Sequence, residues 1–265
     1  MRRALSSAIA AARSAGALMR QHLNSPKRIH STSRHDIKIE LDVRCQRLIG
    51  RRLGRTHPKV PVLGEEGMQG NLDAPWRWVV DPIDGTVNFV HGIPHASVSI
   101  ALQRRQSRPR GMFDGYASVV GVVLDPFGDE LWTAVEGGLA RRNGRVIRVS
   151  SRTRLSDSMV TVGFAKSRRS LDRMLGVFLS LVRSVRKVRI MGSAALGLTY
   201  VASGRFDGYL EAGLRLWDIA AGALIIERAG GRCDCQPAGE DYLYALCASN
   251  GRLHRALRRR FDAQT

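Results

Sequence analysis

Long apolar segments are missing from this sequence. The longest apolar run lies around residues 219–226 and falls far short of the roughly 20 residues that a membrane-spanning helix needs. The sequence therefore predicts a soluble, cytoplasmic protein with no part in the membrane. At 265 residues, with 44% hydrophobic residues, the chain can bury a substantial core.

Acidic residues and lysine are also scarce. The chain has 42 basic residues, of which only five are lysine, against 23 acidic residues, and its formal net charge is +19. Such a surplus would attract nucleic acid, anionic membranes or phosphorylated metabolites without specificity. The basic residues are scattered along the whole chain, however, which is also typical of an arginine-rich surface that is simply solvated.

Cysteine occurs only four times, without a CxxC pair and without a histidine spacing suited to zinc. Cys233 and Cys235 are two positions apart on a predicted strand, so their side chains should share one face of it. The sequence predicts that these thiols, with those of Cys45 and Cys247, are buried and reduced.

The first 35 residues contain no acid at all. The segment 2–23 is rich in arginine, serine and alanine and is amphipathic, which is typical of an organellar transit peptide. It is equally typical of a first structural helix, because its apolar residues recur at three- and four-residue spacing. We expect the structural helix, and nothing in the segment predicts secretion.

Two different patterns follow along the chain. After an exposed loop at 24–36, the first half predicts a helix at 41–55, a turn at 104–111 and mainly antiparallel strands, at 60–67, 76–82, 95–103, 117–126 and 130–138. Pro82 is expected to stop the second of these strands. The second half predicts strands at 158–164, 186–192 and 206–213, which alternate with helices at 170–185, 193–204 and 217–231. We place a seam near residues 140–155, between halves 1–145 and 146–265 of one compact unit.

Acids stand where they do little for folding, at strand ends and at the start of a helix. Glu65 lies in 64-GEE-66, Asp81 and Asp84 in 81-DPIDGT-86, and Asp218 in 217-WD-218. A carboxylate among apolar residues costs several kcal/mol unless it is paired or bound to metal. Arginine could pair with these acids, or they could converge on a hard cation such as Mg²⁺, with the Ile83 carbonyl as a further ligand.

Two short glycine motifs suggest a second kind of ligand. Gly85–Thr86 and 192-GSA-194 each place a small hydroxyl residue after a glycine at a predicted turn or helix start. Exposed amides at such places bind anions, although a simple helix cap has the same pattern. Acids that bind metal beside amides that bind phosphate are typical of a site that cleaves phosphoesters.

These motifs resemble the inositol monophosphatase family. The resemblance rests on 81-DPIDGTVNFVHGIP-94, with 64-GEE-66 before it and 217-WDIAAGALIIERAGG-231 after it, and it extends over about residues 8–258. It implies a lithium-sensitive, Mg²⁺-dependent phosphatase. It also implies the α/β fold that the family shares with fructose-1,6-bisphosphatase, a layered α–β–α–β–α sandwich that is usually a homodimer.

The resemblance also implies roles for single residues, with two to three Mg²⁺ ions in the site. Glu65, Asp81 and the Ile83 carbonyl would hold the first ion. Asp81, Asp84 and Asp218 would hold the second, and Glu65 would help to hold a third through water. The catalytic residues would be Glu65, Asp84 and Thr86, with Thr86 and Glu65 positioning the water that attacks phosphorus. The residues implied to contact substrate are Asp84, Gly85, Thr86, Gly192, Ser193, Ala194, Glu211 and Asp218.

The chain departs from the family pattern without losing a metal ligand. Ile39 stands where a threonine is usual, Gly67 where a serine is common and Ala165 where a proline is common, while Lys27 and Arg28 are out of register with the family's loop lysine. Lys166, Arg168 and Arg169 would contact a second phosphate, or they form a solvated face. These departures leave the substrate open.

The predicted function is hydrolysis of inositol monophosphate or a related polyol or sugar phosphate. Within the same class, histidinol phosphate, adenosine 3′,5′-bisphosphate and fructose 1,6-bisphosphate are alternatives, although residues 90–102 look more like the inositol branch. A different class is a role in RNA processing through contact with RNA or RNA polymerase, as in some bacterial members of the family. The +19 charge makes such a partner physically plausible.

Overall fold

The computed structural model describes residues 1–26, 29–33, 36–71, 73–106, 114–164 and 167–263. Four residues singled out above, Lys27, Arg28, Ala165 and Lys166, lie outside these ranges, as does most of the turn predicted at 104–111. Within the described ranges, no helix is both long and apolar enough to cross a membrane.

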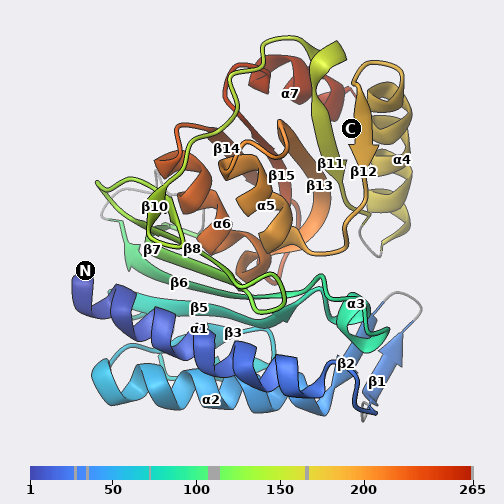
Figure 1. The fold of residues 1–265 in the computed structure, drawn as a ribbon. Coiled ribbons are helices and arrows are strands. Elements are labelled where there is room, and N and C mark those ends of the chain that lie inside the picture. The colour runs from blue at the N-terminus through green and yellow to red at the C-terminus, as the bar shows by residue number, and fades with distance from the viewer. Residues whose placement is uncertain (27–28, 34–35, 72, 107–113, 165–166, 264–265) are drawn as a thin grey trace.

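Two long helices form the first layer. Helix α1 (Arg2–His22) and helix α2 (Glu40–Thr56) cover one face of the first sheet (Figure 1). α1 buries a row of small residues, including Ala4, Ala8, Ala12 and Ala15, which lets it approach the sheet closely. The structural helix expected at 2–23 is therefore present and belongs to the core.

The first sheet has eight strands in the order β10-β9-β8-β7-β6-β5-β3-β4. Their bounds are β3 Val62–Gly64, β4 Gly67–Gln69, β5 Trp76–Asp84, β6 Ser97–Arg105, β7 Tyr116–Asp125, β8 Glu130–Val135, β9 Arg141–Arg142 and β10 Arg145–Val146. All neighbours are antiparallel except β3 and β5, which run parallel. The antiparallel meander predicted for the first half is confirmed.

Helices α5 (Ala194–Ala202) and α6 (Leu216–Arg228) fill the space between this sheet and a second one. The second sheet has the order β12-β11-β13-β15-β14. Its strands are β11 Met159–Val162, β12 Lys187–Arg189, β13 Gly208–Arg215, β14 Arg232–Pro237 and β15 Leu243–Ser249. Helices α4 (Arg168–Val182) and α7 (His254–Asp262) cover its outer face (Figure 1). The predicted α–β–α–β–α sandwich is confirmed.

Three apolar clusters hold these layers together. One joins α1 and α2 to the first sheet, one surrounds α5 and α6, and one lies beneath α4 and α7. All four cysteines are buried and free, and the sulfur atoms of Cys233 and Cys235 are 3.7 Å apart on one face of β14. Burial raises the pKa of the Cys45 and Cys247 thiols to about 12.

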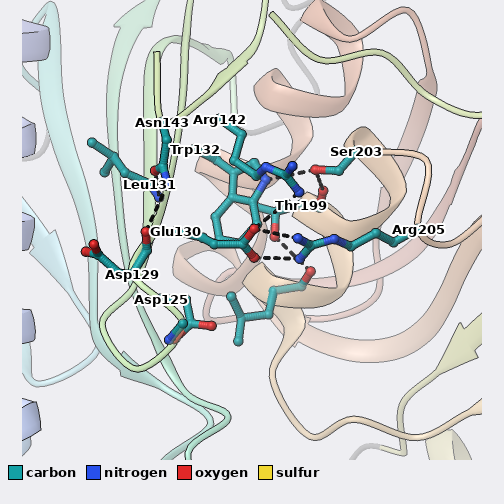
Figure 2. A network of polar contacts seen from close by, with 12 residues as sticks. Asp125, Asp129, Glu130, Leu131, Trp132, Arg142, Asn143, Thr199, Ser203 and Arg205 are labelled. Carbon is teal, nitrogen blue, oxygen red and sulfur yellow. Dashed lines mark hydrogen bonds and ion pairs between the residues drawn. The ribbon is translucent and has the colours of Figure 1, made fainter. Parts of the chain in front are cut away.

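A polar network joins the first sheet to the end of α5 (Figure 2). Glu130 on β8 accepts hydrogen bonds from Arg205, which follows α5, with one oxygen–nitrogen distance of 2.6 Å, and pairs with Arg142 at 3.2 Å. The indole of Trp132 donates to the Ser203 hydroxyl at 2.8 Å. We call these five residues the Glu130 network.

The structure corrects two predictions about secondary structure. Pro82 does not end its strand, because β5 continues to Asp84 across a shift in its pairing with β6. Such a bulge tolerates a residue without an amide proton. The segment 24–36 is not only a loop, since β1 (Ile29–Ser33) and β2 (Asp36–Ile39) pair there as an antiparallel hairpin.

Candidate active site

The irregular end of β5 places the central acids. Asp81 pairs with Ser99 and Asp84 with Ser97, so two residues of β5, Pro82 and Ile83, stand opposite one residue of β6, Val98. One Asp81 carboxylate oxygen accepts the Ile83 amide at 3.0 Å. The Ile83 carbonyl accepts the Thr86 hydroxyl at 2.8 Å, which brings Thr86 to the expected carbonyl ligand. The bulge thus turns both carboxylates and one carbonyl toward the same region.

Gly85 makes the sharp exit from this strand possible. Its φ of 89° lies in the left-handed region, and a Cβ there would be 3.0 Å from the His95 carbonyl oxygen and 3.1 Å from that of Gly192. Only glycine satisfies both conditions. The chain then enters the short helix α3 (Thr86–Val90), which starts at Thr86.

Asp84 is bound to the beginning of α5, more than a hundred residues along the chain. Its carboxylate accepts the Ala194 and Ala195 amides, each at 3.0 Å, the Ser97 hydroxyl at 3.0 Å and the Ser193 hydroxyl. The amides of Ala194 and Ala195 therefore bind a carboxylate of the protein itself. Asp84 thus occupies the anion site expected at the start of this helix. The hydrogen bonds from the helix start stabilise the charged form of Asp84.

Glu65 reaches the site from the turn between β3 and β4. Its amide donates to the Val80 carbonyl at 3.2 Å, which aligns it with β5 next to Asp81. Gln46 on α2 holds this turn by accepting the Glu66 amide and donating to the Gly67 carbonyl, both at 2.9 Å. A helix of the first layer thereby fixes the acidic turn.

The second half contributes two more acids. Asp218 lies in the first turn of α6, where its carboxylate accepts the Arg215 amide at 2.7 Å. Glu211 lies on β13, where it accepts a hydrogen bond from the Tyr209 hydroxyl. Both positions follow from the strand–helix succession β13–α6 that the sequence predicts.

All the predicted site residues line one cavity of about 840 Å³. They are Glu65, Asp81, Ile83, Asp84, Gly85, Thr86, Gly192, Ser193, Ala194, Glu211 and Asp218. Gly67 and Ser167 also line it. The structure brings the predicted set together, and the role of each member stays a prediction.

Burial and crowding disfavour negative charge in this cavity. Burial raises the pKa of Asp81 well above its usual range, and the nearby Glu65, Asp84 and Asp218 raise it further. Burial likewise raises the pKa of Asp218 well above its usual range, with Asp84 and Glu65 adding to the effect. The pKa of Asp84 is also raised by burial, although its four hydrogen bonds oppose the shift.

Within the part of the chain that the structure describes, arginine side chains do not balance Asp81, Asp84 or Asp218. Among the described residues, no ion pair involves Asp81, Asp84 or Asp218. An oxygen-only donor set with excess negative charge suits a hard divalent cation. Within the described ranges, however, no group of three Asp, Glu, His or Cys side chains is arranged so that it could hold a metal ion as it stands. The residues present fit Mg²⁺ by the chemistry of their donors, as oxygen-bearing acids that line one cavity.

Glu211 differs from the other acids. Burial raises its pKa to about 7, and the hydrogen bond from Tyr209 opposes that shift. At neutral pH the Glu211 carboxyl is thus close to its titration midpoint. It lies in the cavity that holds the predicted metal ligands and can accept a hydrogen bond from a bound molecule.

Four residues that shape the site were not predicted. They are Gln46, Ser97, Gly163 and Tyr209, which contact or make room for Glu66, Asp84 or Glu211. A sequence signal existed for Tyr209, because residues two apart on a strand share a face. Gln46 is a polar residue on the apolar side of its helix, which is also a detectable signal.

Known proteins resemble this chain over most of its length. A model of the inositol monophosphatase family matches residues 1–263. The Nus factor SuhB of Xylella fastidiosa is 40% identical over 235 residues, which cover 87% of this chain and 81% of that protein. The inositol-1-monophosphatase of Rhizobium meliloti is 40% identical over 228 residues, which cover 84% and 82%. The solved structure of the Thermotoga maritima IMPase has a TM-score of 0.86 at 30% identity, over 100% of this chain and 98% of that one.

The fold, the placement of the acidic motifs and the extent of these matches agree with one another. Proteins of the matching family are generally metal-dependent phosphatases. The resemblance stated from the sequence is confirmed, and the chain belongs to the inositol monophosphatase family.

Proposed function

We propose that this protein is a Mg²⁺-dependent phosphomonoesterase that hydrolyses inositol monophosphate or a related polyol or sugar phosphate. One observation carries the proposal: Glu65, Asp81, Asp84 and Asp218 arrive from three separate segments, the β3–β4 turn, the end of β5 and the start of α6, and line one cavity. Asp84 raises the pKa of both Asp81 and Asp218, and Asp218 raises that of Asp81. None of these three acids has an ion pair among the described residues. A fold gains nothing from such crowding unless a cation binds.

The proposed ligands are shared between the ions. Glu65, Asp81 and the Ile83 carbonyl would hold one Mg²⁺, and Asp81, Asp84 and Asp218 a second, with a third near Glu65. Bound Mg²⁺ would lower the pKa of the attacking water and neutralise charge on the transferring phosphoryl group. Two or three ions would also offset the repulsion among the carboxylates.

The remaining residues would orient water and substrate. The Thr86 hydroxyl, fixed by its hydrogen bond to the Ile83 carbonyl, would hold the attacking water together with Glu65. Gly85 and Thr86 would face the phosphate, because Gly85 turns the backbone there. Glu211, Gly192, Ser193 and Ala194 would face the hydroxyl-bearing part of the substrate. As implied by the family, we also propose a cytoplasmic homodimer that Li⁺ inhibits.

A substrate panel tests this proposal directly. Release of phosphate from inositol 1-phosphate, histidinol phosphate, adenosine 3′,5′-bisphosphate and fructose 1,6-bisphosphate is measured with Mg²⁺ and with EDTA, with and without Li⁺. We expect Mg²⁺-dependent turnover, fastest for inositol 1-phosphate. Undiminished hydrolysis in EDTA would refute the metal mechanism, and equal turnover of all four esters would refute the narrow substrate. A crystal soaked with Mn²⁺ and phosphate would locate the ions.

A second candidate function is binding to RNA or RNA polymerase. It is favoured by the 40% identity to a protein named Nus factor SuhB and by the net charge of +19. The test is binding of single-stranded RNA by the wild type and by Asp84→Asn, across a series of salt concentrations. Salt-sensitive binding that survives in the inactive variant would support a separate role. No binding at low salt would exclude RNA as the direct partner.

A further inference from the structure

We infer that Tyr209 is a positioning residue that, together with the space left by Gly163, fixes the carboxylate of Glu211 for recognition of a substrate hydroxyl. The inference rests on the proposed function, because it assigns a task to the substrate side of the same cavity. It adds two residues of adjacent strands to that site. It also explains how an acid on a buried strand keeps one orientation.

Tyr209 has a buried hydroxyl with one described polar partner. Its side chain is 3% exposed, and its hydroxyl donates to the Glu211 carboxylate. Burial and the adjacent Glu211 raise the pKa of Tyr209 well above its usual range. The phenol therefore stays protonated and remains a donor at any working pH. Tyr209 and Glu211 are two apart on β13, so both side chains lie on the same face of the strand.

Gly163 provides the space that the carboxylate occupies. It follows β11, which runs parallel to β13 with Val162 beside Leu210, so the next pair along the strands is Gly163 and Glu211. A Cβ built on Gly163 would overlap the Glu211 carboxyl group. Any residue larger than glycine at 163 must displace Glu211. The carboxylate is thus confined by the backbone on one side and held by the phenol on another.

The ring of Tyr209 is itself fixed by α5. A Cβ on Gly197 would be 3.2 Å from one edge carbon of the ring, so helix and ring are in close contact. α5 is the helix whose first amides bind Asp84. The same helix therefore fixes one predicted metal ligand at its start and the support of Glu211 one turn later. Asp84 and Tyr209 are thus both supported by α5 on this side of the cavity.

A hydrogen bond to a charged acceptor has a measurable effect on binding. Its loss corresponds to about a tenfold change in affinity or more. If Glu211 accepts a hydrogen bond from a substrate hydroxyl, the loss should appear only with substrates that carry a hydroxyl near the ester. Inositol 1-phosphate has such hydroxyls, and p-nitrophenyl phosphate has none. The two esters therefore separate positioning from general damage.

The test compares Tyr209→Phe with Tyr244→Phe. Tyr244 is a matched control, because it is 1% exposed on the adjacent strand β15 and donates to Asp114 instead of to the cavity. We expect Tyr209→Phe to raise KM for inositol 1-phosphate about tenfold, with kcat and both constants for p-nitrophenyl phosphate nearly unchanged. Tyr244→Phe should change none of them. Equal losses on both esters, or no loss on either, would overturn the inference.

Gly163→Ala supplies an independent variant. It should raise KM for inositol 1-phosphate as Tyr209→Phe does, whereas Gly54→Ala, where a Cβ meets nothing within 4 Å, should behave like the wild type. Crystal structures give a readout that needs no turnover. The carboxylate of Glu211 should adopt a different position in Tyr209→Phe and keep its wild-type position in Tyr244→Phe. A wild type inactive on both esters would reject the proposed phosphatase, and an unmoved Glu211 in Tyr209→Phe would reject the positioning role.

Discussion

Two regions of this protein hold carboxylates in opposite ways. In the Glu130 network, one acid is surrounded by Arg205 and Arg142, and its charge is balanced within the fold (Figure 2). In the cavity, Asp81 and Asp218 are surrounded by other acids and have no ion pair among the described residues. The chain has 42 basic residues, so the difference cannot arise from a shortage of arginine. Glu130 is paired with arginine, whereas Asp81 and Asp218 have no such pair among the described residues, as expected of acids that would bind a cation.

The largest expected effect is on activity. Asp81→Asn should lower the rate of phosphate release about a thousandfold or more, because a shared ligand of two ions is lost. Glu130→Gln, an amide substitution of the same kind in the paired region, should leave kcat within about twofold of the wild type. Steady-state hydrolysis of inositol 1-phosphate measures both. Comparable losses of kcat in the two variants would show that the two regions do not differ in their importance for activity.

The second largest expected effect is a rise in thermal stability when Mg²⁺ binds. A ligand at a hundred times its Kd stabilises the folded state by about 2.7 kcal/mol, so the Tm of the wild type should rise in Mg²⁺. The Tm of Asp81→Asn should rise much less, and that of Glu130→Gln as much as the wild type. Calorimetric scans with Mg²⁺ and with EDTA measure this. An equal rise in Asp81→Asn would mean that Mg²⁺ binds elsewhere.

The pH dependence of stability should also separate the regions. The folded-state pKa of Glu211 is raised to about 7, and that of Asp81 and Asp218 is raised as well. Acids with raised pKa values stabilise the fold below their ordinary pKa near 4, and this contribution is lost as pH rises through the folded values. Metal-free protein should therefore lose stability between about pH 4 and pH 7 and beyond, and Mg²⁺ should flatten the decline. Urea unfolding across this range tests the sign.

The smallest expected effect is on the free energy of unfolding in the absence of metal, which amide substitutions should change in opposite directions in the two regions. Without metal, and at a pH high enough for Asp81 to be ionised, Asp81→Asn should raise the free energy of unfolding by about 1 kcal/mol, because it removes a crowded buried charge. Glu130→Gln should lower it by about 1 kcal/mol, since the pairs with Arg205 and Arg142 are partly exposed. Denaturant titrations in EDTA measure both. A loss of stability in both variants would contradict the assignment of Asp81 to a ligand site.

The sequence predicted the helices, the strands and the acids from the cost of burying polar groups, whereas the order of the layers followed from the family resemblance. Apolar periodicity separates strands from helices, and carboxylates at strand ends are conspicuous because burial makes them costly. It did not predict the supports of those acids, since these depend on contacts between distant segments. The Ala194 amide, for example, meets Asp84 across 110 positions. Pro82 was misjudged because a missing amide proton ends a regular strand but not a bulged one.

The four buried thiols can report local unfolding, because each can react only when the structure around it opens. Alkylation requires an exposed thiolate, and each thiol here is buried and free, with Cys45 in the first helical layer and Cys247 in the second sheet. Labelling followed by mass spectrometry would therefore time the opening of each region separately. We propose that residues 1–145 and 146–265 open as one cooperative unit, for which equal labelling rates at the two positions are the expected signature.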